Sequence, residues 1–105
     1  MLVPKRADIF DTIDLTPQDH AALSRESRLF SQAIMRAFDG EKLNVAALGN
    51  MTPQLHIHHI VRYKNDAAWP GPIWGQHPLT PYTKDEAADI KARLSAQNIS
   101  GFTAV

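Results

Sequence analysis

Three of the five histidines lie close together, at positions 56, 58 and 59, within an otherwise apolar segment. Successive side chains of a β-strand point to opposite faces, so Gln54, His56 and His58 share one face and His59 lies on the other. Neutral imidazole acts as a nucleophile, a general base or a metal ligand near pH 7. This row is the strongest candidate site in the chain.

Three roles are open for these histidines. They could be structural, as a single strand histidine usually is. They could bind zinc or non-haem iron, since two imidazoles on one side of a strand suit both metals. A third ligand would then have to come from His77 or Asp66, and no carboxylate lies nearby in the sequence.

The third role is nucleophilic attack on phosphorus through one ring nitrogen, while a hydrogen bond to the other nitrogen fixes the tautomer. The turn that precedes the histidines, Gly49–Pro53, supplies backbone N–H groups together with Asn50 and Thr52. Such fixed dipoles stabilise the charge that develops on phosphoryl oxygens during transfer.

One long helix should support this strand. Thr16 followed by Pro17 is typical of a helix start, and Asp19 falls in the first turn. Apolar residues then recur at helical spacing. We expect a helix from Pro17 to Phe38 across one face of a sheet, with Gly40 as the left-handed residue that follows it.

The remaining elements are short. Residues 43–48 form an apolar strand that should pair antiparallel with the histidine strand through a glycine–asparagine turn. A second helix should begin after Thr83 and end near Gln97, followed by a loosely held tail. These elements predict an α+β fold: a small antiparallel sheet, one long helix across a face and a short C-terminal helix.

Both tryptophans lie in a proline-rich stretch, at positions 69 and 74. Such a segment cannot form regular structure, yet it carries the largest apolar side chains. We interpret it as a lid over the core or a subunit contact in preference to a wall on which a nucleotide base stacks.

The composition excludes several classes of protein. At 105 residues the chain is predicted to be one domain, residues 1–105, and its 11 basic and 11 acidic residues give no net charge. We therefore expect no nucleic acid polymer and no anionic membrane surface as partner. No apolar run is long enough to span a bilayer and no signal peptide is recognisable, so a cytoplasmic location is expected. Without cysteine there is no disulfide or thiolate chemistry.

The segment from Pro53 to Arg62, PQLHIHHIVR, resembles the histidine-triad (HIT) superfamily of nucleotide hydrolases and transferases. That family has the signature His-φ-His-φ-His-φ-φ, where φ is apolar. The order of the other elements is also similar: Leu-Val-Pro-Lys-Arg, a long helix, a strand with Asn44, and later Trp69-Pro70. The resemblance covers most of residues 1–75.

The resemblance implies a role for each histidine position. The nucleophile, which forms a covalent nucleotidyl-histidine, falls on His56, and the histidine beside the phosphate and leaving group falls on His58. The first position carries Gln54, which can still form hydrogen bonds. A shifted register of His56, His58 and Ile60 would make His58 the nucleophile. We prefer the first register because Arg62 then keeps its expected spacing.

The resemblance also implies phosphate contacts. The family's phosphate-contacting asparagine corresponds to Asn44, and its hydroxyl or amide near the turn corresponds approximately to Asn50 or Thr52. His59 occupies a position that is apolar in the family. We therefore expect His59 to be a buried residue with a hydrogen-bond partner.

Family members have several dozen residues before the strand that Met1–Lys5 represents, with ribose and base contacts among them. This sequence lacks them, so we expect an exposed edge and a homodimer. The expected function is nucleotidyl hydrolysis or transfer on a nucleotide substrate, with no cofactor or metal. A non-catalytic nucleotide-binding or scaffolding protein is the alternative, and a metal-dependent enzyme is the third.

Overall fold

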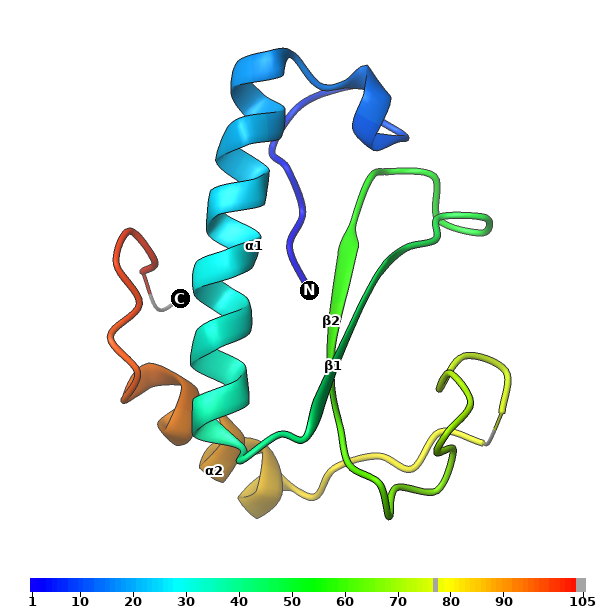
Figure 1. The fold of residues 1–105 in the computed structure, drawn as a ribbon, viewed down its shortest axis with the longest axis vertical. Coiled ribbons are helices and arrows are strands. Elements are labelled where there is room, and N and C mark those ends of the chain that lie inside the picture. The colour runs from blue at the N-terminus through cyan, green and yellow to red at the C-terminus, as the bar shows by residue number, and fades with distance from the viewer. Residues whose placement is uncertain (77, 104–105) are drawn as a thin grey trace.

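The long helix α1 (Pro17–Ala37) runs beside a pair of antiparallel strands, β1 (Lys42–Ala47) and β2 (Ile57–Arg62), in a computed structural model that describes residues 1–76 and 78–103 (Figure 1). A short 3-10 helix, Thr12–Asp14, precedes α1, and helix α2 (Lys84–Ser95) follows the strands. The predicted α+β class, with one long helix and a short C-terminal helix, is confirmed.

Helix α1 begins where the sequence predicts. The hydroxyl of Thr16 accepts a hydrogen bond from the Asp19 N–H at 3.1 Å, and Pro17 occupies the first turn. A capping oxygen satisfies one of the N–H groups that the first turn leaves without a partner. Ala33 and Ile34 are buried on the side that faces the sheet, so the amphipathic pattern predicts the buried face correctly.

The end of α1 differs from the prediction by one residue. Asp39, with φ of 47°, takes the left-handed conformation, and the Gly40 N–H donates to the Met35 carbonyl at 3.0 Å. A Cβ on Gly40 would lie 2.6 Å from both Met35 Sδ and Val61 Cγ1. Glycine is needed there because the helix end packs closely on the strand.

The two strands pair in the predicted antiparallel sense. His58 lies opposite Ala46, and Ile60 lies opposite Asn44. β2 begins at Ile57, so the strands are joined by a long loop instead of a tight turn. The backbone of Leu2 bridges the other edge of β2 through two hydrogen bonds with Ile57, of 2.9 and 2.8 Å. The N-terminal segment therefore has the pairing partner that its apolar sequence requires.

The core forms on the side of β2 that α1 covers. Leu55 and Ile57 are buried with Leu15, and Ile9 and Leu23 pack against them. The Leu55 N–H also donates to the Ile9 carbonyl at 2.9 Å, which ties the segment before α1 to the approach of β2. Residues 55, 57 and 59 are buried and their neighbours less so, as the alternation predicts.

Helix α2 begins with a capping box. The Glu86 N–H donates to the Thr83 hydroxyl at 3.2 Å, and the Thr83 N–H donates to the Glu86 carboxylate at 2.7 Å. α2 lies near the C-terminal end of α1 (Figure 1). In the described part of the tail, residues 99–103, the Phe102 ring stacks on Phe30 with centroids 6.1 Å apart. The loosely held tail stays a prediction.

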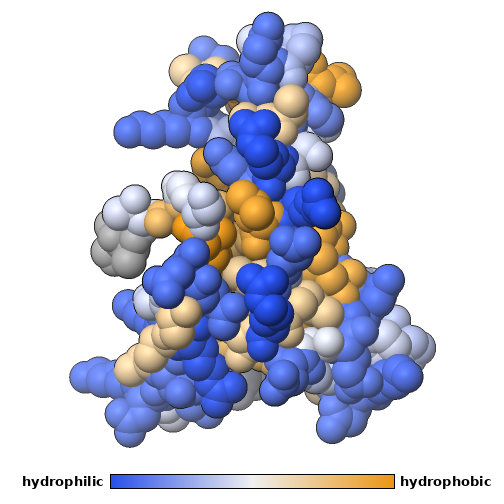
Figure 2. Space-filling model, turned by 60° about the vertical axis from the view of Figure 1, so that its left-hand side comes forward, coloured by the Kyte–Doolittle hydropathy of each residue, from blue (hydrophilic) through white to orange (hydrophobic). Residues whose placement is uncertain are grey.

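Figure 2 shows that hydrophobic residues gather in the middle of one face, with hydrophilic residues around them. A groove beside helix α2 is bordered by Phe30, Leu94, Ile99 and Phe102. Within the described part of the chain, no helix is both long enough and apolar enough to cross a membrane.

Leu55→Ala should lower the free energy of unfolding by about 3 kcal/mol, because it leaves a cavity in the core beneath the histidine strand. Urea unfolding at pH 7.5 measures this, with Leu79→Ala as the matched control, since Leu79 is 91% exposed and Leu55 only 2%. Equal stability of the two variants would contradict the assigned core.

Candidate active site

His56 lies just before β2 with a defined tautomer. Its ring Nδ1 is 2.7 Å from the Gln54 carbonyl oxygen. A carbonyl oxygen only accepts hydrogen bonds, so Nδ1 carries the proton in the neutral ring and Nε2 keeps its lone pair. This is the arrangement that nucleophilic attack through Nε2 requires.

His58 lies beside His56 on the same side of the strand. The two ring centroids are 5.0 Å apart and the ring planes meet at 73°. Burial lowers the pKa of His58, and positive charge on His56 or at the Met1 ammonium lowers it further. His58 is therefore held in its neutral form near pH 7.

Trp74 closes one side of this pair. Its ring centroid lies 5.5 Å from that of His58, in an edge-to-face arrangement of 75°. The preferred interpretation of the tryptophan segment, a lid over the core or a subunit contact, missed this contact. A tryptophan among prolines gives no signal of where its loop will fold.

Asn44 reaches the site face from β1. Strand pairing places Asn44 opposite Ile60, and therefore on the face that carries His58. The Arg62 Nη1 donates to the Asn44 Oδ1 at 2.8 Å. Because a guanidinium only donates, this contact fixes the side-chain amide with its Nδ2 donor turned away from Arg62.

Arg62 is almost completely buried, with 2% of its surface exposed. The Asp66 carboxylate binds it at two points, Nε to Oδ2 at 2.8 Å and Nη2 to Oδ1 at 2.9 Å. Arg62 in turn raises the stability of the charged carboxylate and holds the pKa of Asp66 far below its usual range. In the sequence, Arg62 served only to set the register of the motif, and this network was not predicted.

The Gln54 side chain is bound to the N-terminal segment. Its Nε2 donates to the Arg6 carbonyl at 3.3 Å and to the Pro4 carbonyl at 3.5 Å. The side-chain amide of Gln54 therefore anchors the N-terminal segment, and it is the backbone carbonyl of Gln54 that contacts His56. The expected contact of Gln54 with a phosphate or leaving group stays a prediction.

The turn before the histidines passes close to His56. A Cβ on Gly49, whose φ is 83°, would lie 4.0 Å from the His56 Cε1. Asn50 and Thr52 are exposed in this turn. Their assignment to phosphate oxygens stays a prediction.

His59 points to the opposite face, as expected. Its Nδ1 is 3.2 Å from the Ile57 carbonyl and its Nε2 is 2.7 Å from the Ser27 hydroxyl on α1. The Phe30 ring also packs against that of His59 in an edge-to-face arrangement, with the ring centroids 5.3 Å apart. Burial lowers the pKa of His59, so the neutral ring accepts a hydrogen bond from the Ser27 hydroxyl at Nε2.

Two residues were considered as a third metal ligand beside His56 and His58. Asp66 is bound to Arg62, and His77 lies outside the described residues. Among residues 1–76 and 78–103, no group of three or more His, Cys, Asp or Glu side chains could hold a metal ion.

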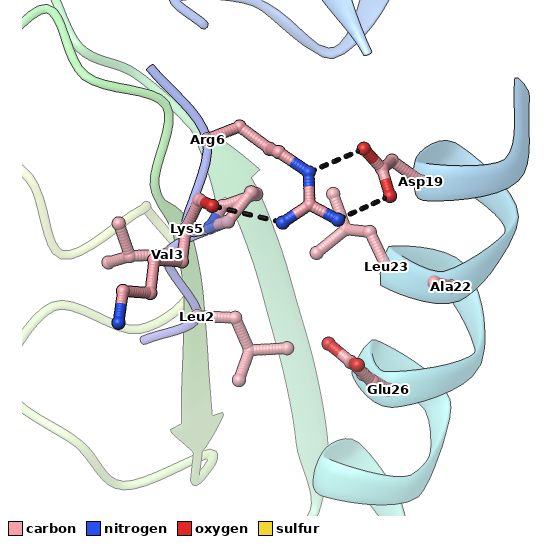
Figure 3. A pocket seen from close by; sticks show the side chains of 9 residues that line it. Leu2, Val3, Lys5, Arg6, Asp19, Ala22, Leu23 and Glu26 are labelled. Atoms are coloured by element: carbon pink, nitrogen blue, oxygen red, sulfur yellow. Dashed lines mark hydrogen bonds and ion pairs between the residues drawn. The ribbon is translucent and has the colours of Figure 1, made fainter. Parts of the chain in front are cut away.

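A cavity of about 320 Å³ lies between the N-terminal segment and α1 (Figure 3). Leu2 and Leu23 line it, and Glu26 and the Arg6–Asp19 ion pair border it. None of its lining residues belongs to the histidine row, so the cavity is separate from the candidate active site.

Residues 1–65 match the model of the HIT domain. A search of the curated proteins found no match.

Three solved structures are similar over 90% of the chain. A histidine triad protein from Sinorhizobium meliloti 1021 is 41% identical, with a TM-score of 0.87 and 70% of its own length covered. One from Marinobacter aquaeolei VT8 is 48% identical, with a TM-score of 0.86 and 69% covered. One from Bradyrhizobium japonicum is 39% identical, with a TM-score of 0.88 and 71% covered.

The lowered pKa values of His58 and His59 predict a loss of stability in mild acid. The unfolded chain takes up these protons near pH 6.5, at a higher pH than the folded chain does. The free energy of unfolding should therefore fall as pH is lowered from about 7.5 to about 5.5. Urea unfolding across this range measures the effect, and NMR titration should place both midpoints below 6.5. A His59 midpoint above 6.5 would contradict the assignment.

Proposed function

We propose that this chain, which belongs to the HIT-domain family, is a nucleotide hydrolase or nucleotidyl transferase that works through a covalent nucleotidyl-histidine. The Nε2 of His56 attacks the α-phosphorus and forms a P–N bond, while the bond from phosphorus to the leaving group breaks. Water or another acceptor then attacks the same phosphorus, the P–N bond breaks, and the nucleotidyl group passes to the acceptor while the imidazole is restored. The substrate class is a nucleoside monophosphate ester, a phosphoramidate or a dinucleoside polyphosphate.

The observation that carries this proposal is the 2.7 Å contact between His56 Nδ1 and the Gln54 carbonyl. It fixes the proton of the neutral ring on Nδ1, which leaves the Nε2 lone pair for attack, and it stabilises the positive charge that the ring gains on attack. A backbone carbonyl also restricts rotation of the ring, so the nucleophile is oriented before substrate arrives.

Two further side chains would contact the substrate, one at the leaving group and one at the phosphate. His58, neutral and with its ring centroid 5.0 Å from that of His56, is assigned to the leaving group. Asn44 offers its Nδ2 donor on the same face. Donors held at fixed positions stabilise the oxygens that gain charge in the transition state. Asn50 and Thr52, with the N–H groups of their turn, are assigned to the remaining oxygens.

We also propose that the chain acts as a homodimer. Met1 and Val3, at the edge beside β2, are 62% and 52% exposed, and Val45 on β1 is 49% exposed. Apolar side chains along sheet edges favour association with another chain. The nucleotide is its small-molecule partner in this proposal.

His56→Ala should reduce AMP release from adenosine 5′-phosphoramidate by about 1,000-fold or more, because the variant lacks the nucleophile. The assay includes a chelator, so that a metal-dependent activity is not counted. His20→Ala is the matched control, since His20 lies in the first turn of α1.

Loss of activity in His58→Ala while His56→Ala stays active would instead favour the shifted register, with His58 as nucleophile. AMP binding by the wild-type protein without any release would favour the non-catalytic alternative.

Trp74→Ala should raise KM roughly 3- to 10-fold, because the indole forms the wall of the site beside His58. Trp74→Phe should keep most of the wild-type KM, since a smaller aromatic ring preserves part of the contact. Tyr82→Ala, an exposed aromatic residue, is the control. An unchanged KM in Trp74→Ala would remove Trp74 from the substrate site.

A further inference from the structure

We infer that Arg62 is a positioning residue that presents the Asn44 amide to the phosphate and ties the tryptophan loop to the site. The inference rests on the proposed function for its substrate class. The guanidinium of Arg62 is buried, and it takes no direct part in the attack by His56.

The bonding of Arg62 is more extensive than an ion pair. Besides Asp66, its guanidinium donates to the Asn44 Oδ1 at 2.8 Å and to the Gly71 carbonyl at 2.8 Å. The ring of Trp69 lies 5.5 Å from the Arg62 Cζ. A buried cation is tolerated only when such partners replace water. Lysine cannot reproduce this planar set of donors.

The contact with Asn44 determines which end of the amide faces the site. An unrestrained asparagine can turn its amide over and present either oxygen or nitrogen to a ligand. Arg62 has no acceptor, so it binds only the Oδ1. The Asn44 Nδ2 group is then free to donate to a phosphoryl oxygen. The opposite orientation, in which the Asn44 Oδ1 would face the phosphoryl oxygen, is disfavoured.

The same guanidinium organises the loop that follows β2. Asp66 accepts hydrogen bonds from the N–H groups of Tyr63 and Ala68, both at 3.1 Å, while Arg62 binds the Gly71 carbonyl. Trp74, three residues after Gly71, contacts His58. The Arg62 side chain thus connects β1 to the loop that carries Trp74.

The test is a double-mutant cycle on AMP release from adenosine 5′-phosphoramidate. Arg62→Lys should lower kcat about 10-fold or more, because the Asn44 donor acts mainly on charge that develops in the transition state, while KM should rise by no more than the roughly 3- to 10-fold expected for Trp74→Ala. In an Asn44→Ala background, the kcat loss from Arg62→Lys should be at least about fivefold smaller. Equal losses in both backgrounds would overturn the inference.

The matched control is Arg93→Lys. Arg93 pairs with Asp89 at 2.8 Å across the same four-residue separation, but on exposed α2. Its kcat should equal that of the wild type. A similar loss there would mean that the effect of Arg62→Lys is not specific to the site.

A second readout does not need turnover. The side-chain NH2 resonances of Asn44 should shift when AMP is added to the wild type and should lose most of that shift in Arg62→Lys. If the wild type shows the shift but releases no AMP, the proposed transfer fails and the positioning role stands. If AMP leaves the Asn44 NH2 unshifted in the wild type, the positioning role is wrong. If Arg62→Lys does not fold, Asp66→Asn replaces it in this NMR experiment. The same loss of the Asn44 shift is then expected, and the same results would contradict the positioning role.

Discussion

The packing of β2 against α1 determines where every other group of the site lies. Leu55 and Ile57 are buried in the core, and His59 reaches α1 through Ser27. A shift of one residue would place His56 and His58 in that apolar layer and expose the leucine and isoleucine. The positions of the two imidazoles therefore follow from burial of their neighbours. Their chemistry is set afterwards, by the groups that each ring contacts.

Those contacts give each histidine a different state. The Gln54 carbonyl fixes the proton of His56 on Nδ1, and burial with nearby positive charge keeps His58 neutral. His59 is neutral as well, but its two nitrogens are occupied by Ile57 and Ser27. Only the first two rings face the side of the sheet that Asn44 and Trp74 also reach. The Asp66–Arg62 pair holds that side together because its donors reach both β1 and the loop.

The parts that were predicted from sequence depend on local chemistry. The caps at Thr16 and Thr83 involve residues three apart, and alternation along β2 needs only the strand itself. The end of α1 was one residue off because Gly40 is required by contact with Val61, which is distant in sequence. Burial of His59 was expected from its apolar position in the family motif.

The site residues that were missed or undervalued depend on how a loop folds back. Trp74 meets His58 across a proline-rich segment that has no periodicity to interpret. Arg62 was visible as an arginine at the end of an apolar strand with an aspartate four residues later, a spacing that permits a pair but does not show that it is buried. For Gln54, nothing in the sequence indicates that its backbone carbonyl contacts His56 while its side chain binds the N-terminal segment.

The most direct test of this account is to trap the covalent intermediate. Wild-type protein is mixed with adenosine 5′-phosphoramidate, quenched within milliseconds at alkaline pH, digested and mapped by tandem mass spectrometry, with ³¹P NMR to identify the substituted nitrogen. We expect an adenylyl group on the Nε2 of His56, as the proposed mechanism requires. An adenylyl group on His58, or on the Nδ1 of His56, would contradict it.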